Sequence, residues 1–415
     1  MKILKVVHTA SFLLITPVIF GQRVVIPWPQ VTDSSDLVDT HSRPIEYQEK
    51  KTWSFPEPGV YISNEFTGAR VNEVTELNDS TFSLTIRPEN FPINMSPWYA
   101  FKIWSRSPGD IYIKLRYEHG RHRYYPKTSK NGKNWTPVRQ TDYFSTSKDT
   151  TAFFRLHTGT DTLWVSAQEL MTSEWLAKWV RMLAEKPWIR DTVFGYSTLG
   201  KPLRAMKIGS ENAPNMLIIL SRQHPPEITG FKEMNAFVET LNGDSRLARK
   251  FRKNFYVVVA PMMNPDGVDN GHWRHNAGGI DLNRDWRWFN QPETFAFRAF
   301  VLGEREKHHS TVRYGIDFHS TQVDLFYMPA DKDLPSGKGI TRPWITKINK
   351  KFPDHPFSPE PSGLTGQISK NWILHELHAE AITYEVGDNT DREVIRKRGE
   401  TSAKLLMKIL LKEKY

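Results

Sequence analysis

Residues 215–227, NMLIILSRQHPPE, decide the fold of the second half of this 415-residue chain. Their first six residues form an almost wholly apolar run of strand length, and polar residues and two prolines follow at once. Over residues 230–241 the apolar side chains then recur at helical spacing. The stretch therefore predicts a buried strand, a turn and an amphipathic helix, a succession that is typical of α/β domains.

The same alternation continues through the rest of the chain. Three further apolar runs of strand length are FYVVVAPM, YGIDF and AITYEV. Amphipathic segments predicted as helices alternate with them, at residues 294–308, 344–352 and 392–414. We therefore predict an α/β/α domain with a mixed or mostly parallel sheet over residues 169–415. In such sheets, binding and catalytic residues collect at the carboxyl ends of the strands.

Residues 53–168 have a different pattern. Short runs such as VYISNEF, WYAFKIW and DIYIKLRY are alternating or continuously apolar, and Pro, Gly, Asn and Asp separate them. They predict an antiparallel β-sandwich domain over residues 22–168. A helix predicted from Ser173, SEWLAKWVRMLAEK, would join the two halves. Chemistry-bearing residues do not gather at short spacing in the first half, so support or recognition is its expected role.

The first 21 residues predict a cleaved export signal. They begin with MKILK, continue with an apolar run from Val6 to Phe20 and reach a small residue at Gly21. We therefore expect a periplasmic or extracellular protein. No other run approaches the roughly 20 apolar residues that span a bilayer, so no membrane-spanning segment is expected.

Composition excludes several classes of protein. With 39% hydrophobic and 12% aromatic residues, the chain resembles a globular protein rather than a disordered or fibrous one. It contains no Cys, which excludes disulfides and Cys-ligated metal sites. The net charge of +10 favours anionic partners. Because the chain has no Arg-rich tract and no aromatic RNA-binding motif, no nucleic-acid partner is expected.

Two motifs at strand ends contain candidate metal ligands. His224 and Glu227 lie three residues apart in HPPE, directly after a strand, and can converge on one ion. Such a pair occurs by chance about once in a chain with fourteen His, so alone it is a weak signal. His319 in DFHS, at the end of another predicted strand, completes two imidazoles and one carboxylate. This set leaves a coordination position open for water, which predicts a catalytic Zn²⁺ site.

Glu385 is a candidate general base. It ends the nearly apolar run AITYE, where a carboxylate without a partner would be costly to bury. A zinc-bound water would be such a partner. Glu385 could take a proton from this water and deliver it to a leaving amine.

The loops between the ligands contain candidate substrate-binding residues. NPDG, WRHN and DLNRDW follow the strand FYVVVAPM and contain Arg274 and Arg284. One guanidinium can bind a carboxylate through two parallel hydrogen bonds, and a second can polarise a carbonyl under attack. Substrate binding explains these residues better than surface salt bridges do.

The order HPPE, NPDG, WRHN, DLNR, DFHS and TYEVG resembles the M14 zinc carboxypeptidase family. It is most similar to the cytosolic-carboxypeptidase branch, in which a β-sandwich precedes the peptidase domain. The resemblance implies three zinc ligands, namely His224, Glu227 and His319. It also implies that Glu385 is the general base and that Arg274 polarises the scissile carbonyl. Asn283 and Arg284 would bind the terminal carboxylate of the substrate.

One segment departs from the family pattern. Many members have a Tyr two residues after a Trp in the loop before the base strand, where it closes over the substrate. Here Trp372 is followed by Ile373 and Leu374. The sequence therefore predicts that the capping Tyr is missing, which affects closure and specificity rather than the hydrolytic residues.

The predicted function is zinc-dependent removal of C-terminal residues from peptides or proteins. The substrate would carry a free C-terminal carboxylate and be acidic or derived from a cell wall, given the basic chain and the export signal. A murein-peptide amidase with the same metal chemistry is an alternative. So is a non-catalytic binding protein whose β-sandwich recognises a glycan or a protein. An aspartoacylase-type deacylase is disfavoured by NPDG and DLNR.

Overall fold

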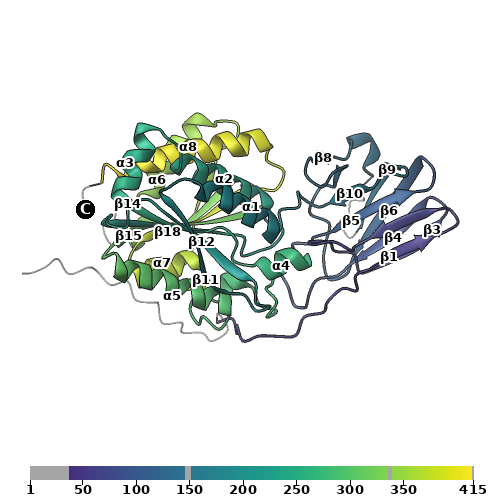
Figure 1. The fold of residues 1–415 in the computed structure, drawn as a ribbon, viewed down its shortest axis with the longest axis horizontal. Coiled ribbons are helices and arrows are strands. Elements are labelled where there is room, and N and C mark those ends of the chain that lie inside the picture. Colours follow the sequence, from purple (N-terminus) through teal and green to yellow (C-terminus); the bar gives the residue numbers. More distant parts are fainter. Residues whose placement is uncertain (1–36, 145–150, 335–338, 414–415) are drawn as a thin grey trace, which may run out of the picture.

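The computed structural model describes residues 37–144, 151–334 and 339–413. The predicted export signal, residues 1–21, lies outside them. Figure 1 shows two parts side by side, one built of strands and one of strands and helices. We call residues 37–168 the β-region and residues 169–413 the α/β region. None of the helices in the described residues is long and apolar enough to cross a membrane.

The β-region consists of two sheets that share a hydrophobic core. The larger sheet has the order β1 (Thr52–Phe55), β2 (Val60–Ser63), β5 (Ala100–Ser105), β10 (Leu163–Ser166), β7 (Lys127–Ser129) and β8 (Thr136–Pro137). The smaller sheet has the order β3 (Glu73–Asn78), β4 (Thr81–Ile86), β6 (Gly109–Tyr117) and β9 (Thr151–Thr158). Alternate residues of the strands face the core, as period-2 patterning predicts; Phe82 and Leu84 of β4 are examples.

One strand pair departs from the predicted antiparallel arrangement. Strands β4 and β6 are neighbours and run parallel, while the other pairs of both sheets are antiparallel. The cause is the path of the chain between them. After β4 it crosses to the other sheet to form β5 and then returns, so β6 points the same way as β4. Parallel strands need such a crossover connection.

The α/β region contains an eight-stranded mixed sheet, which confirms the predicted fold class. Its order is β11 (Ile189–Tyr196), β12 (Pro202–Ile208), β14 (Phe255–Ala260), β13 (Asn215–Ser221), β15 (Thr311–Thr321), β18 (Glu380–Gly387), β16 (Leu325–Met328) and β17 (Ser358–Pro361). The central strands β14, β13, β15 and β18 are parallel. They are almost continuously apolar because helices cover both faces.

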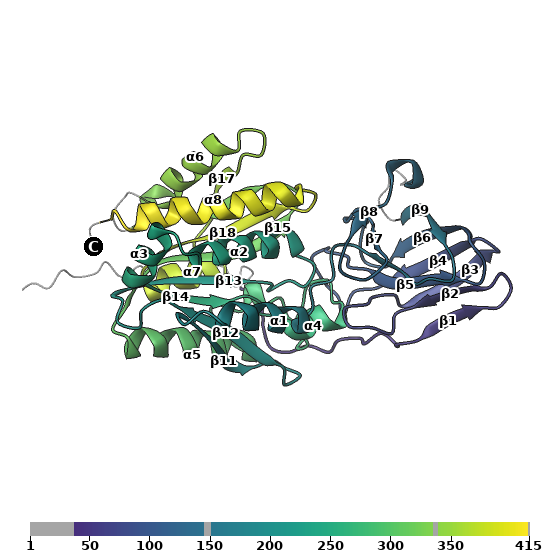
Figure 2. The same cartoon turned by 45° about the horizontal axis from the view of Figure 1, so that its top comes forward.

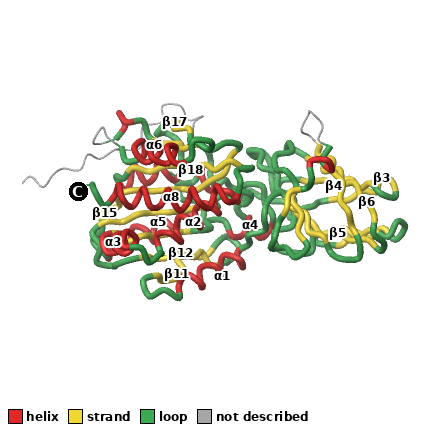
Figure 3. The backbone as a smooth tube through the Cα atoms, turned by 90° about the horizontal axis from the view of Figure 1, so that it is seen from above, coloured by secondary structure: helices red, strands yellow, loops and turns green. Residues whose placement is uncertain are grey.

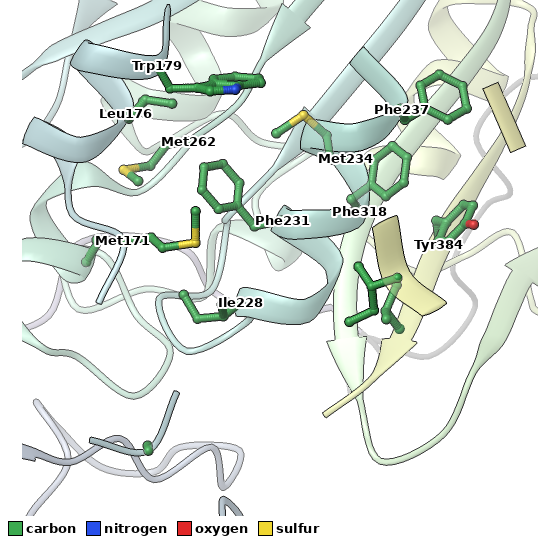
Figure 4. Close-up of a cluster of buried hydrophobic side chains, with 14 of the residues drawn as sticks. Met171, Leu176, Trp179, Ile228, Phe231, Met234, Phe237, Met262, Phe318 and Tyr384 are labelled. Carbon is green, nitrogen blue, oxygen red and sulfur yellow. The ribbon is translucent and has the colours of Figure 1, made fainter. Parts of the chain in front are cut away.

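Helices pack on both faces of this sheet (Figure 2). One face carries α2 (Ile228–Leu241), α3 (Arg246–Asn254), α6 (Thr341–Lys351) and α8 (Arg392–Leu410). The other carries α5 (Pro292–Lys307) and α7 (Ser369–Leu377). In Figure 4, Met234 and Phe237 of α2 lie on the side of Phe318 of β15, while Ile228 and Phe231 lie on the side of Met171 and Met262. This packing fixes α2 against the two strands that carry His319 and Glu385.

The two regions meet through loops rather than through a shared sheet. Figure 3 shows loops, drawn in green, between the strands of the β-region and those of the α/β region. Helix α1 (Ser173–Ala184) begins directly after this junction, as predicted, and α4 (Pro265–Asn270) lies beside it. The loops at the junction include those that follow β14, so the β-region borders the part of the molecule where site residues were predicted.

Candidate active site

The carboxyl ends of three parallel strands bring the predicted ligands and base together. His224 follows β13, while His319 and Glu385 lie at paired positions of β15 and β18. After β13 the chain turns at Arg222, whose φ of 53° is in the left-handed region. Arg222 is buried and donates to the Pro225 carbonyl at 2.8 Å, which holds this turn. A strained non-glycine residue at such a place is typical of functional sites.

The three predicted metal ligands form a compact buried cluster. The Nδ1 atom of His224 lies 2.8 Å from Oε1 of Glu227, and the Nδ1 atom of His319 lies 2.7 Å from Oε2. One ligand atom from each residue falls within 4.8 Å of the others. All three side chains are almost completely shielded from solvent. Two imidazole nitrogens and one carboxylate therefore converge on one point, as a three-ligand metal site requires.

The cluster depends on a close approach between α2 and β15. Gly230, in the first turn of α2, leaves no room for a side chain, since a Cβ there would lie 2.0 Å from the His319 carbonyl oxygen. The backbone N–H of Gly230 also donates to the hydroxyl of Ser320 at 2.9 Å. Because α2 begins directly after Glu227, this contact sets the distance between Glu227 and His319.

Two carboxylates that the sequence reasoning left without a role hold the imidazoles from behind. Oδ1 of Asp281 lies 2.8 Å from Nε2 of His224, and Oδ2 of Asp317 lies 2.8 Å from Nε2 of His319. A carboxylate on the outer ring nitrogen is the usual partner of a metal-binding histidine, because it fixes the tautomer that offers the other nitrogen. Asp281 begins the motif DLNR and Asp317 begins the motif DFHS. Their place in these motifs was the sequence feature from which their role could have been predicted.

Glu385 is only partly shielded, but its Oε2 atom is buried and has no hydrogen-bond partner among the described residues. Burial raises the pKa of this carboxyl above its ordinary value, and the charges of Glu227 and Asp317 act in the same direction against that of His319. An unpaired buried oxygen is costly unless a ligand completes it. A water or a substrate in the cleft would provide that partner.

The charges of the site favour a bound cation. Four carboxylates lie in or against the cluster, namely Glu227, Asp281, Asp317 and Glu385. The guanidinium of Arg274 balances part of this charge. Buried carboxylates are stable when they are paired or coordinate metals. The ligand set and the outer carboxylates therefore fit a divalent metal, and nitrogen and oxygen donors in this combination suit Zn²⁺.

The predicted substrate-binding residues lie beside the cluster on the loops that follow β14. Arg274 is buried and its Nε donates to Oδ2 of Asp281 at 2.7 Å. Asn283 and Arg284 lie on the short 3-10 helix η3 (Leu282–Arg284). The side chain of Arg284 is 37% exposed, so its charge remains available to a ligand. The Oδ1 atom of Asn283 accepts the Ser369 backbone N–H at 3.0 Å, which ties η3 to the start of α7.

A single cleft of about 610 Å³ contains all seven predicted residues. They are His224, Glu227, Arg274, Asn283, Arg284, His319 and Glu385. The β-region contributes Val38, Asn94, Met95 and Arg123 to its wall. Its volume lies in the range of ordinary ligand sites, although its lining is unusually polar. The cleft is therefore formed by both regions, which the sequence did not indicate.

The interpretation of Leu374 as the position of a missing cap was wrong. Trp372 and Leu374 are both buried in α7, and Trp372 stacks on Trp286 with ring centroids 5.0 Å apart. Neither residue lines the cleft. The identity of Leu374 therefore concerns the packing of α7 rather than closure over a substrate. Among the residues that the structure describes, the aromatic side chain in the lining of the cleft is that of Tyr327 of β16, which is 37% exposed.

Comparisons with known proteins agree with this geometry. The family model for zinc carboxypeptidases matches residues 176–388. Mouse cytosolic carboxypeptidase 3 is 23% identical over 306 residues, which cover 64% of this chain. The chain spans only 30% of the length of that relative. Cytosolic carboxypeptidase 2 of Xenopus tropicalis is 33% identical over 166 residues, 38% of this chain and 16% of the relative.

The fold also matches solved structures over both regions. A metallo-carboxypeptidase from Burkholderia cenocepacia aligns with a TM-score of 0.68 at 19% identity, covering 85% of this chain and 98% of that one. One from Pseudomonas aeruginosa, solved with (2-guanidinoethylmercapto)succinic acid, aligns with a TM-score of 0.65 at 20% identity, covering 84% and 97%. These likenesses concern the fold alone. Because the family model covers half of the chain and includes every site residue, the protein belongs to the zinc carboxypeptidase family.

Proposed function

We propose that this protein is a zinc-dependent metallocarboxypeptidase that removes C-terminal residues from peptides or proteins. The observation that carries the proposal is the shared cleft. It joins a three-ligand cluster with its outer carboxylates, a carboxylate with an unpaired buried oxygen, and two arginines. Peptide hydrolysis at a free C terminus uses each of these parts. A non-catalytic binding protein would not need this combination of parts in one cleft.

His224, Glu227 and His319 would hold the zinc. A zinc ion there would supply a Lewis acid that lowers the pKa of water and polarises a carbonyl oxygen. Glu385 would take a proton from the attacking water and then donate it to the nitrogen of the leaving amine, so that no net proton is lost.

The arginines would orient the substrate. Arg274, which Asp281 holds through its Nε, would stabilise the negative charge that develops on the carbonyl oxygen. Arg284 presents an exposed guanidinium that can bind a terminal carboxylate through two hydrogen bonds. Asn283 lies beside it and would donate a further hydrogen bond. The cationic residues of the cleft also support a preference for acidic peptides.

Metal and activity measurements test this proposal together. Purified protein should contain close to one equivalent of zinc, lose activity to a chelator and regain it with zinc. The substrates are peptides that end in Glu, Lys or an aromatic residue, and a γ-glutamyl-diaminopimelate peptide. Release of the C-terminal amino acid from the first group supports the proposal. Hydrolysis of only the diaminopimelate peptide would replace it with a murein-peptide amidase, and zinc-free inactive protein would favour a binding role.

We also propose that residues 1–21 direct export, so that the substrates are peptides of the cell envelope or the surroundings. The charged start and the apolar run support this. Cell fractionation should find the mature protein, shortened near Gly21, outside the cytoplasm. Full-length protein confined to the cytoplasm would contradict the export proposal without affecting the proposed chemistry.

A further inference from the structure

A carboxylate of the β-region reaches across the junction to the loop that carries Arg274. Glu89 follows β4 and is completely buried. Its Oε2 accepts the backbone N–H of Trp273 at 2.8 Å. Its Oε1 accepts the backbone N–H groups of Arg274 at 2.9 Å and His275 at 2.6 Å. One side chain therefore satisfies three consecutive amides of a segment 184 to 186 residues away in the chain.

The next residue strengthens this contact. Oδ1 of Asn90 lies 2.6 Å from Nδ1 of His275, and its Nδ2 donates to the Gly279 carbonyl at 3.0 Å. Glu89 and Asn90 thus hold the loop from Trp273 to Gly279 at several points. Backbone amides that are buried without a partner are costly, so this segment depends on the β-region for its hydrogen bonding.

Three backbone N–H donors face the carboxylate of Glu89, which favours its ionised form. Burial by itself would raise the pKa of the carboxyl. Interactions with His272, His275 and Arg70, together with the N–H bond from Trp273, outweigh burial and hold the pKa below its ordinary value. A carboxylate can only accept hydrogen bonds, and here it faces three donors. Charge-assisted bonds of this kind are stronger and shorter than neutral ones, which makes the loop geometry well defined.

The contact bears directly on the cleft because of where Arg274 lies. Its backbone N–H is held by Glu89 and its Nε by Asp281. These two contacts hold the backbone of Arg274 and the inner nitrogen of its guanidinium, and Arg274 lines the cleft. A shift of the backbone at Arg274 would move the guanidinium away from a substrate carbonyl, and small misplacements of catalytic groups cost large factors in rate.

We propose that Glu89 is a positioning residue of the active site, through which the β-region fixes the backbone of residues 273–275 and thereby the guanidinium of Arg274. The inference rests on the proposed function for its kinetic part. It assigns the β-region a defined contribution to catalysis in addition to support.

A double-mutant cycle separates positioning from general support. Glu89→Gln keeps the size of the side chain, but its amide nitrogen cannot accept the Trp273 N–H. We expect this variant to lower kcat by about tenfold to a hundredfold while KM changes much less. In the Arg274→Ala background the same change should have almost no further effect, because coupled residues are not additive. Glu89→Asp, which keeps the charge with a shorter reach, should lie between wild type and Glu89→Gln.

Asp142→Asn is the matched control. Asp142 is a buried carboxylate of the β-region that is bound to Arg139 and Arg155, both of the same region. Its loss should leave kcat unchanged. Additive effects of Glu89→Gln and Arg274→Ala, or a kcat for Glu89→Gln equal to that of wild type, would overturn the positioning role.

Hydrogen exchange provides a readout that needs no activity. In Glu89→Gln, peptides that contain residues 273–275 should exchange their amide hydrogens faster than in wild type, and in Asp142→Asn they should not. Unchanged exchange at these amides would overturn the proposal even if the enzyme is inactive. If the wild-type protein shows no peptidase activity that depends on Glu385, the proposed function is refuted. The hydrogen-exchange result then decides the role of Glu89 by itself.

Discussion

The two halves of the candidate active site are held in different ways. The half with the proposed metal ligands and base, which we call the metal-and-base half, consists of His224, Glu227, His319 and Glu385. It is fixed by parallel strands of a single sheet and by the start of α2. The substrate half, centred on Arg274, lies on a loop whose backbone is held by Glu89 from the other region. The first half depends on local motifs and sheet register. The second depends on the contact between two regions of the chain.

Within one cleft, the candidate metal ligands and the candidate substrate-binding residues therefore depend on different parts of the fold. Strand ends place the ligands within the narrow geometry that a metal requires. A substitution that moves the loops held by the β-region can therefore leave the positions of these ligands unchanged. Asp281 connects the halves, since it contacts both His224 and Arg274. Substitutions that affect one half, the other or the connection should therefore produce distinguishable effects.

The largest effect is expected in the metal-and-base half. Glu385→Gln preserves the size of the side chain but removes its ability to take a proton. General acid–base groups contribute about 10²–10⁴-fold to rates, so kcat should fall by that range with zinc content unchanged. Steady-state kinetics and metal analysis measure both quantities. A variant that retains more than half of the wild-type kcat would remove Glu385 from the mechanism.

The next effect should come from the substrate half. Arg274→Ala should lower kcat by about 10²–10³-fold, the cost of losing one stabilising donor at a developing oxyanion. Zinc affinity should change less than kcat, because the side-chain hydrogen bond of Arg274 goes to Asp281 rather than to a ligand. Added guanidinium should restore part of the rate, whereas Arg274→Lys should restore less, because a lysine ammonium cannot reproduce the donor that Arg274 gives to Asp281 together with further donors toward the carbonyl. If Arg274→Ala lost zinc and activity to the same extent, the two halves of the site would not act independently.

A third comparison tests the connection between the halves. Asp281→Asn should weaken zinc binding about 10–100-fold, the usual cost of losing an outer partner of a ligand. Its kcat should remain low even at saturating zinc, because Arg274 also loses its anchor. Asp317→Asn is the matched control, since Asp317 contacts His319. Excess zinc should restore its kcat, and the same recovery in Asp281→Asn would contradict the connecting role.

The last prediction concerns stability at acid pH, and its effect on activity at neutral pH should be the smallest of the set. Glu169 precedes α1 and receives two hydrogen bonds from Arg392, at 2.8 and 3.0 Å. Burial would raise the pKa of this carboxyl, but Arg392 and Lys232 outweigh burial and lower the pKa to about 2. Because the folded pKa lies below the unfolded value, the stabilisation is complete above about pH 4.5 and is lost as the pH falls toward 2.

The expected loss is about 3 kcal/mol in the free energy of unfolding over this range. Chemical denaturation at a series of pH values measures it. Glu169→Gln should be less stable than wild type at neutral pH, and the difference should shrink as the pH falls. A difference that stays constant down to about pH 2 would show that Glu169 does not titrate as described.

Much of the fold and the metal-and-base half could be predicted because short motifs coincide with strand ends. The predicted segment 230–241 differs from helix α2 by two residues at its start. Helix α7 was missed because nearly all of its own residues are buried. Its sequence therefore lacks the alternation of apolar and polar residues that marks a helix with one exposed face. The same gap led to the misplaced interpretation of Leu374.

The contacts that hold the substrate half could not be predicted. Glu89 is a single acidic residue in a loop, 185 residues from Arg274, and its partners are backbone amides that have no sequence signature. Asp281 and Asp317 lay within recognised motifs, but their roles depend on which ring nitrogen each one meets. Such assignments require the packed structure, since they follow from tertiary contacts rather than from spacing.

The most direct test of the proposed carboxypeptidase activity uses one peptide in two forms, with a free and with an amidated C terminus. Zinc-loaded wild type and Glu385→Gln are incubated with each form, and the products are identified by mass spectrometry. We predict stepwise loss of C-terminal residues from the free form, strongly reduced loss from the amidated form, and release with Glu385→Gln that is slower by the same factor of about 10²–10⁴. Internal cleavage, or equal cleavage of both forms, would contradict a site built to bind a terminal carboxylate.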